Sequence, residues 1–140
     1  MRFDPAQYPD APRWPFGDSP ELADELLALV LAGQKRATCN SLADAKARGL
    51  MPKLGEINIV LDGAGQPACS IETTAVDIMR FDAVDAAFAA EEGEGDGSLA
   101  FWRDAHQAYF RRQGTFDADM LVVCERFALR DIFERPEPVR

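Results

Sequence analysis

The chain has 140 residues, 47% of them hydrophobic, and a formal net charge of -9 at pH 7. This length is typical of a single domain with its own core, and the negative charge argues against a general polyanion binder, because non-specific nucleic-acid affinity comes from many lysine and arginine contacts to phosphate. The three cysteines are widely spaced and form no CxxC pair, which indicates a reduced intracellular protein and argues against a disulfide framework or a structural zinc site.

The beginning of the chain combines an extended segment with a helix. Residues 1–17 are rich in proline and aromatic side chains, which predicts an extended lead-in and not a separate domain. Asp18 or Ser19 then caps a helix, and a proline suits its first turn. We expect this helix to run from Pro20 to Ala32, because its apolar face ends where a glycine follows.

A short helix and a hairpin come next. Ser41, with Asp44 three residues later, is typical of a capping box, which predicts a helix through Arg48. The sequence INIVL (residues 57–61), the turn DGAGQP and the alternating stretch at residues 68–76 then predict a β-hairpin. The chain thus changes from helical to strand periodicity near its middle.

The second half returns to helices before it ends in strands. We expect a third strand through Phe81 and then a helix that Asp82 and Asp85 open and that ends at the glycine-rich loop EEGEGDGS. Apolar side chains at helical spacing predict another helix in SLAFWRDAHQAYF. The stretches MLVVCERF and LRDIF supply the last strands, and residues 134–140 form a frayed tail.

These elements favour one mixed α+β domain over residues 18–133. Their order lacks the strict alternation of a parallel doubly wound sheet, and no repeat or long linker divides the chain. No apolar run approaches the roughly 20 residues that a membrane span needs, and the N-terminus lacks the order of a signal peptide. We therefore expect a cytoplasmic protein without a membrane partner.

A dense run of polar residues, AGQKRATCNS (residues 32–41), follows the first helix at a point where a glycine alone would end it. Basic residues predominate from Lys35 to Lys53, and acidic residues from Asp82 to Asp96. A locally basic surface can bind an anion on an acidic protein, although two solvated faces of opposite sign explain the pattern equally well. The polar run is the first candidate for a functional site.

Four stretches carry a resemblance to a known family. GQKRAT after a helix, MPKLGEINIVLDGAGQPACSIETTAV, EEGEGDGSLAFWRDAHQAYF and MLVVCERF together resemble the bacterial ASCH family, in the family's order from about Trp14 to Phe127. The resemblance implies a PUA-like fold, which is a small twisted β-barrel of about five to six mostly antiparallel strands with flanking helices around a cleft. It also implies an association with RNA or nucleosides.

The resemblance further implies a catalytic trio. Some small ASCH proteins hydrolyse N-acylated cytidine with a lysine, a threonine and a glutamate, the first two in a KxxT pattern after the first helix, whereas others are similar to ribonucleases. Lys35 and Thr38 match this pattern, and Glu92 is the favoured third partner because it precedes a glycine after an alanine-rich helical run. Glu94 is the second choice, since the acidic stretch that begins at Glu91 gives no certain register.

Elementary chemistry supports the trio. A threonine hydroxyl needs a neighbouring base, and a lysine serves as that base only when its neutral form is accessible, which adjacent Arg36 would favour. A glutamate can hold the lysine, orient a water or donate to a leaving amine. The alternative is a structural ion pair between Lys35 and Glu92, with the methyl group of Thr38 packed against the barrel.

Other residues are candidates for substrate or RNA contact. His106 is the only histidine and is either a satisfied half-buried side chain or a proton shuttle near neutral pH. Four aromatic side chains could stack a base, as aromatic residues of single-stranded RNA modules do, although aromatic residues at helical spacing usually belong to a core. They are Trp14, Phe16, Trp102 and Tyr109. The polar candidates are Arg36, Ser41, Lys53 and Glu94, of which Ser41 also has its capping role.

Two function classes remain open. One is a hydrolase that acts on RNA or on a modified nucleoside, and the other is a non-catalytic RNA-binding or regulatory module that uses the same cleft. The carboxylates of the loop GEGDG would repel phosphate unless a metal intervened. We expect no obligatory metal and no cofactor, so that hydrolysis does not depend on a divalent ion.

Overall fold

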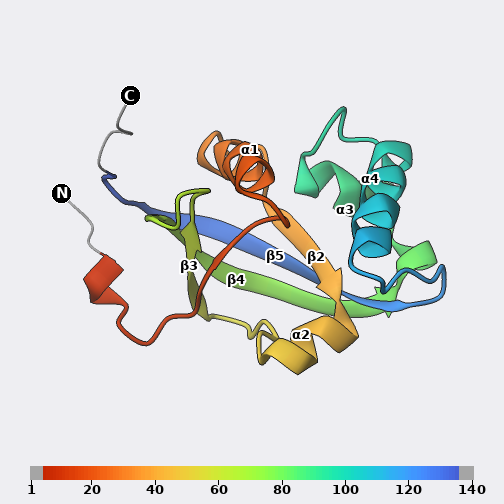
Figure 1. The fold of residues 1–140 in the computed structure, drawn as a ribbon, viewed down its shortest axis with the longest axis horizontal. Helices are drawn as coiled ribbons and strands as arrows, with labels where there is room; N and C mark the ends of the chain where they lie inside the picture. The colour runs from red at the N-terminus through yellow and green to blue at the C-terminus, as the bar shows by residue number, and fades with distance from the viewer. Residues whose placement is uncertain (1–4, 136–140) are drawn as a thin grey trace.

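The computed structural model describes residues 5–135, which form a curled five-stranded sheet with helices packed around it (Figure 1). The strand order is β1-β3-β4-β5-β2, and every neighbouring pair is antiparallel except β1 and β3. The strands are β1 (Arg13–Pro15), β2 (Ala37–Ser41), β3 (Ile57–Leu61), β4 (Pro67–Arg80) and β5 (Leu121–Ile132).

The two long strands, β4 and β5, give the sheet its curl. They pair along nearly their whole length, and the register shifts twice, between Ser70 and Ile71 and between Thr73 and Ala75. Such bulges bend a strand and increase its local twist. The result is a half-barrel of five strands with four α-helices, which confirms the predicted α+β class with mostly antiparallel strands.

The α-helices begin at caps that the sequence carries. Ser19 accepts a hydrogen bond from the backbone N–H of Leu22 at the start of the first helix, and Ser41 accepts one from Asp44 at the start of the second. The helices are α1 (Pro20–Leu31), α2 (Leu42–Arg48), α3 (Ala86–Glu92) and α4 (Leu99–Arg112), with 3-10 turns at Pro5–Gln7 and Phe81–Ala83.

The strand predictions were wrong at three places. The hairpin strand and the separate strand expected after it are one continuous strand, β4, and the two final strands are one strand, β5. Strand β2 occupies residues 37–41, where the sequence predicts only a turn before the short helix. Its partner is β5, more than 80 residues further along the chain, so local periodicity carries no signal for it.

Two hydrophobic clusters form the core. One packs α3 and α4 against β2 and β5, with Phe88 and Trp102 among its buried side chains. The other packs α1 against β3 and β4 and includes Val30 and Ile71. The three cysteines are free and buried. The segment that joins α1 to β2 contacts both groups of helices, because the Lys35 backbone N–H donates to the Leu29 carbonyl of α1 and the Arg36 backbone N–H donates to the Glu91 carbonyl of α3.

The described part of the chain, residues 5–135, contains no helix that is long and apolar enough to cross a membrane. Most of the predicted tail at residues 134–140 lies outside that part, but Arg135 belongs to it and donates a hydrogen bond of 2.9 Å to Asp62. The start of the predicted tail is therefore attached to the turn between β3 and β4.

Candidate functional site

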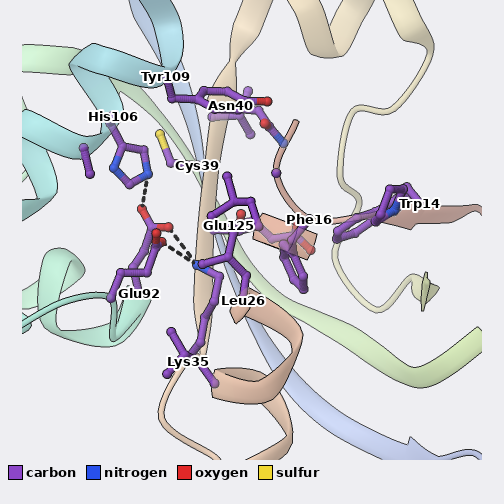
Figure 2. A pocket seen from close by; sticks show the side chains of 18 of the residues that line it. Trp14, Phe16, Leu26, Lys35, Cys39, Asn40, Glu92, His106, Tyr109 and Glu125 are labelled. Carbon is purple, nitrogen blue, oxygen red and sulfur yellow. Dashed lines mark hydrogen bonds and ion pairs between the residues drawn. The ribbon is translucent and has the colours of Figure 1, made fainter. Parts of the chain in front are cut away.

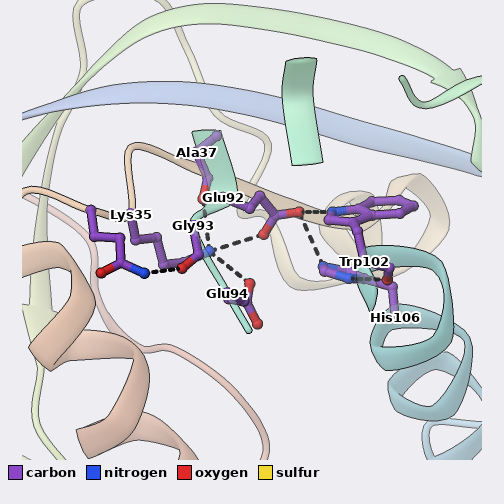
Figure 3. Close-up of polar contacts among 8 residues, drawn as sticks. Lys35, Ala37, Glu92, Gly93, Glu94, Trp102 and His106 are labelled. Carbon is purple, nitrogen blue, oxygen red and sulfur yellow. Dashed lines mark hydrogen bonds and ion pairs between the residues drawn. The ribbon is translucent and has the colours of Figure 1, made fainter. Parts of the chain in front are cut away.

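Lys35 is a fully buried lysine in the segment between α1 and β2, and the residue is 2% exposed. Its ammonium group donates hydrogen bonds to the Ala37 carbonyl at 2.8 Å, to Glu92 Oε1 at 2.9 Å and to Glu94 Oε2 at 3.0 Å (Figure 3). An ammonium has three N–H donors. All three are therefore satisfied within the protein.

The end of α3 brings the two glutamates to Lys35. The helix stops at Gly93, which has a φ of 68°, and a Cβ there would lie 2.3 Å from the Gln34 carbonyl oxygen. The Gln34 side chain donates to the Gly93 carbonyl at 2.7 Å, and the Arg36 backbone N–H donates to the Glu91 carbonyl. Only glycine fits this close approach, so the sequence EGE at residues 92–94 is bound directly to the segment that carries the lysine.

Glu92 is the centre of a buried network. Its second oxygen, Oε2, accepts a hydrogen bond from Trp102 Nε1 and lies 3.1 Å from His106 Nε2. The other ring nitrogen of His106, Nδ1, lies 2.9 Å from the Trp102 carbonyl. Because both ring nitrogens face acceptors, the imidazolium form satisfies both. Glu92 thus lies between two cations, Lys35 and His106.

The charges of this network oppose the effect of burial on its pKa values. Burial alone would raise the pKa of Glu92, but Lys35 and His106 outweigh it and hold that pKa far below its usual range. Burial alone would likewise lower the pKa of Lys35, but Glu92 and Glu94 raise it above its usual value. The expectation that Arg36 makes a neutral lysine accessible is therefore wrong, because two carboxylates contact the ammonium directly.

Glu94 has a different environment from Glu92. Its side chain is 19% exposed, and only its Oε2 contacts Lys35. Burial and the neighbouring Glu92 raise the pKa of Glu94 despite the contact with Lys35. A carboxyl group with a raised pKa and one oxygen outside the ion pair is suited to accept and return a proton.

A cavity of about 350 Å³ opens beside this network (Figure 2). Thr38 contributes its side chain from β2, and the rings of Trp14 and Phe16 contribute one wall. These two rings meet edge to face at 5.0 Å, and the ammonium of Lys35 lies 5.5 Å from the centre of the Phe16 ring. The polar residues that line the cavity include Asn40, Arg48, Asn58, Glu92, Glu94, His106, Tyr109, Arg112 and Glu125.

The structure separates the sequence-based candidates into two groups. The cavity brings together Lys35, Thr38, Glu92, Glu94, Trp14, His106 and Tyr109. Trp102 is 2% exposed and lies stacked against His106 at 4.2 Å, so its ring supports the network and has no face for a base. Arg36 and Lys53 are exposed residues outside the cavity lining, and Ser41 is buried as the cap of α2.

The three glutamates of the acidic stretch contact two different partners. Glu92 and Glu94 both reach Lys35, so the first and second choices for its partner share the same site. Glu91 points elsewhere and forms an ion pair with Arg126 at 2.5 Å. The register that the sequence left open is thus resolved by the turn at Gly93.

Glu125 is a cavity residue that sequence reasoning missed. It lies on β5 directly opposite Thr38 on β2, and it is 7% exposed. The signal that could have found it is an acidic residue in the middle of an otherwise apolar strand, MLVVCERF. Charged residues are almost never buried without a partner or a task.

Three of these side chains also resemble a metal site. One ligand atom from each of Glu92, Glu94 and His106 lies within 4.8 Å of the others. However, the ammonium of Lys35 already bonds to an oxygen of both carboxylates, and His106 Nε2 faces Glu92 as a donor. Because Lys35 already neutralises both carboxylates, a divalent cation would gain little by binding to them.

The charge on His106 predicts a pH-dependent stability. Burial alone would lower the pKa of His106, but Glu92 outweighs it and raises that pKa above its usual value. A raised folded-state pKa adds stability that is fully present below about pH 6.5, the unfolded value, and is lost as the pH rises through the folded-state pKa. Urea denaturation of the wild type and of His106→Gln should therefore differ more at pH 6 than at pH 9. A stability difference that is the same at both pH values would contradict the ion pair.

Comparisons with known proteins cover most of the chain and its fold. A family model described as the ASCH domain matches residues 12–131. The solved structure of an ASCH domain from Lactobacillus crispatus is 37% identical with a TM-score of 0.77, and the match covers 85% of this chain and 79% of that one. A solved protein of Enterococcus faecalis is 39% identical with a TM-score of 0.76, over 86% of this chain and 77% of that one.

No curated protein matches the sequence significantly. The family model nevertheless spans both the segment with Lys35 and Thr38 and the strand with Glu125, and the two solved structures share the half-barrel over most of its length. The chain therefore belongs to the ASCH domain family and has its PUA-like α+β fold.

Proposed function

We propose that the cavity binds one nucleoside whose exocyclic amino group carries an acyl chain, and that the protein hydrolyses this amide. The observation that supports the proposal most strongly is the cavity itself, because Thr38, Lys35 and Glu94 line one cavity beside aromatic rings. Its volume, about 350 Å³, lies at the small end of the range typical of ligand sites. A site of this size suits one nucleoside.

The family resemblance narrows the chemistry of the substrate. ASCH proteins are associated with RNA and nucleosides, and some of them hydrolyse N-acylated cytidine with a lysine and a threonine in a KxxT pattern. Lys35 and Thr38 occupy these two positions in the present chain. We therefore place N-acylcytidine first among the substrates and regard the KxxT segment as the centre of the reaction.

In this proposal Thr38 and Glu94 carry the chemistry. The Thr38 hydroxyl attacks the acyl carbonyl carbon, and its proton passes to Glu94, whose raised pKa favours it as a proton acceptor. The C–N bond then breaks, and the amine leaves with the proton that Glu94 returns. Water hydrolyses the resulting ester by the same route and releases the carboxylic acid, which restores Thr38.

Lys35 and Glu92 act as positioning residues. Lys35 remains an ammonium, since its pKa is raised, and it holds Glu94 by a hydrogen bond of 3.0 Å. Glu92 in turn holds Lys35 and His106. Because Lys35 keeps its proton, it supplies positive charge near the developing oxyanion and does not act as the base.

A second candidate function is a non-catalytic RNA-binding module. The observation that favours it is the position of Arg48, which lines the cavity and ends the helix that also carries Lys46. A base could enter the cavity while the phosphates contact these basic residues. This mode predicts RNA binding that weakens steeply with salt, whereas binding of an uncharged nucleoside is nearly independent of salt.

The experiment that tests the proposal is a hydrolysis assay on a panel of substrates. We expect the purified protein to release acid from N4-acylcytidines, to leave short single-stranded RNAs intact, and to keep its rate within about twofold in the presence of EDTA, because Lys35 supplies the positive charge. RNA cleavage without deacylation would contradict the proposal. Activity that EDTA abolishes and magnesium restores would assign Glu92, Glu94 and His106 to a metal instead.

A further inference from the structure

Glu125 is a buried acid that takes no part in the hydrogen bonds and ion pairs of the network around Lys35. Its carboxylate accepts a hydrogen bond of 2.6 Å from the Thr73 hydroxyl through Oε2. Among residues 5–135, no lysine, arginine or histidine forms an ion pair with it. An uncompensated acid at this depth is costly unless a partner satisfies it.

The position of Glu125 relates it directly to the proposed nucleophile. Glu125 and Thr38 are cross-strand partners in the pairing of β2 with β5. Side chains of directly opposite residues lie on the same face of a sheet, with Cβ atoms about 4.5–5.5 Å apart. Figure 2 shows Glu125 between the pair formed by Lys35 and Glu92 and the ring of Phe16. Its Oε1 is therefore available to a ligand that lies against Thr38.

Two donor side chains that line the cavity, Lys35 and Asn58, are already engaged within the protein. The three N–H groups of Lys35 are used within the protein. Asn58 accepts from Trp14 and donates to Glu56. Burial and the nearby Glu56 raise the pKa of Glu125, which reflects the lack of a cation. A ligand complements this part of the cavity when it brings an N–H donor.

We propose that Glu125 Oε1 accepts a hydrogen bond from the exocyclic amino or acylamino N–H of a cytosine-type base, and thereby selects amino-bearing heterocycles. The aromatic walls at Trp14, Phe16 and Tyr109 suit a planar ring. This inference rests on the proposed function and deepens it, because an amide N–H held by Glu125 places the acyl carbon on the side of Thr38. Glu125 is then a binding residue of the substrate.

A cycle of two ligands and two proteins tests the contact. Cytidine and pyrimidin-2-one riboside, which lacks the 4-amino group, differ only in that donor, and neither is hydrolysed. We expect titration calorimetry to show that the wild type binds cytidine at least about tenfold more tightly than pyrimidin-2-one riboside, as one hydrogen bond to a charged group would give. We expect Glu125→Leu to bind the two nucleosides equally.

The chain supplies a matched control for this cycle. Asp131 also lies on β5, is also 7% exposed and also accepts from a hydroxyl, that of Ser70 at 2.7 Å, but it does not line the cavity. We expect Asp131→Asn to keep the tenfold discrimination. If Glu125→Leu does not fold, Glu125→Gln replaces it, because an amide whose oxygen accepts from Thr73 presents an NH₂ group to the ligand and removes the preference for cytidine.

The outcomes separate this inference from the proposed function. If the wild type deacylates its substrate and both Glu125 variants keep the wild-type preference for cytidine, the role of Glu125 is overturned but the hydrolase function is not. If the preference for cytidine depends on Glu125 but the wild type deacylates no substrate, the hydrolase function is overturned and the recognition of the amino group by Glu125 stands. A wild type that binds neither nucleoside would overturn the inference as well.

Discussion

Replacement of Thr38 by valine is expected to reduce deacylation by about 10³-fold or more, because it removes the proposed nucleophile. Valine keeps the β-branched shape that suits strand β2, and Thr38 is only half-buried. The free energy of unfolding should therefore change by less than about 0.5 kcal/mol. Initial rates on N4-acylcytidine and urea denaturation of the same preparation measure the two effects.

Two matched variants make this prediction specific. Thr38→Ser retains a hydroxyl and should keep the rate within about tenfold, since a primary alcohol can be activated in the same way. Thr74→Val removes an exposed hydroxyl on β4 and should leave the rate unchanged. A Thr38→Val protein that deacylates within tenfold of the wild type would show that a water molecule, and not Thr38, attacks the carbonyl.

Replacement of Lys35 by methionine is expected to lower the free energy of unfolding by about 3–5 kcal/mol at pH 7, as the loss of one partner of a buried ion pair does. Methionine has a similar shape but leaves Glu92 and Glu94 without their ammonium. The deficit should shrink at pH 5, because Glu94, whose pKa is raised, becomes protonated there more readily than a solvent-exposed glutamate. Chemical denaturation at both pH values measures this.

The control for this variant is an exposed lysine. Lys53→Met, in the loop before β3, should change the free energy of unfolding by less than about 0.5 kcal/mol. Equal effects of Lys35→Met and Lys53→Met would contradict the buried network. Lys35→Arg should fail to restore deacylation although it keeps the positive charge, because a planar guanidinium does not reproduce the three diverging N–H bonds of the ammonium.

Local signals in the sequence predicted the helices of this fold. The caps at Ser19 and Ser41 act through neighbours within four positions, so they can be recognised without the rest of the chain. Strand β2 depends instead on its pairing with β5. Residues 37–41 hold no strong strand pattern of their own, and their extended conformation is a consequence of tertiary structure.

The residues of the site were likewise predictable only where a local sequence pattern marks them. The KxxT segment was found through the family resemblance, which also indicated the acidic stretch as its partner. The choice among its glutamates could not be made from sequence, because it depends on how Gly93 turns against Gln34. Glu125 was not found, since its relation to Thr38 exists only through the register of two strands. The sequence thus identified Lys35 and Thr38 in one segment, whereas Glu125, opposite Thr38, became visible only in the folded structure.

The most direct test of the proposed function is a crystal structure of Thr38→Val bound to N4-acetylcytidine. We expect the base between Trp14 and Tyr109, its amide N–H within hydrogen-bond distance of Glu125 Oε1, and the acyl carbon against the side chain of residue 38. Glu94 should lie within reach of the leaving nitrogen. A nucleoside bound outside the cavity, or one whose acyl group points away from residue 38, would contradict the proposed function.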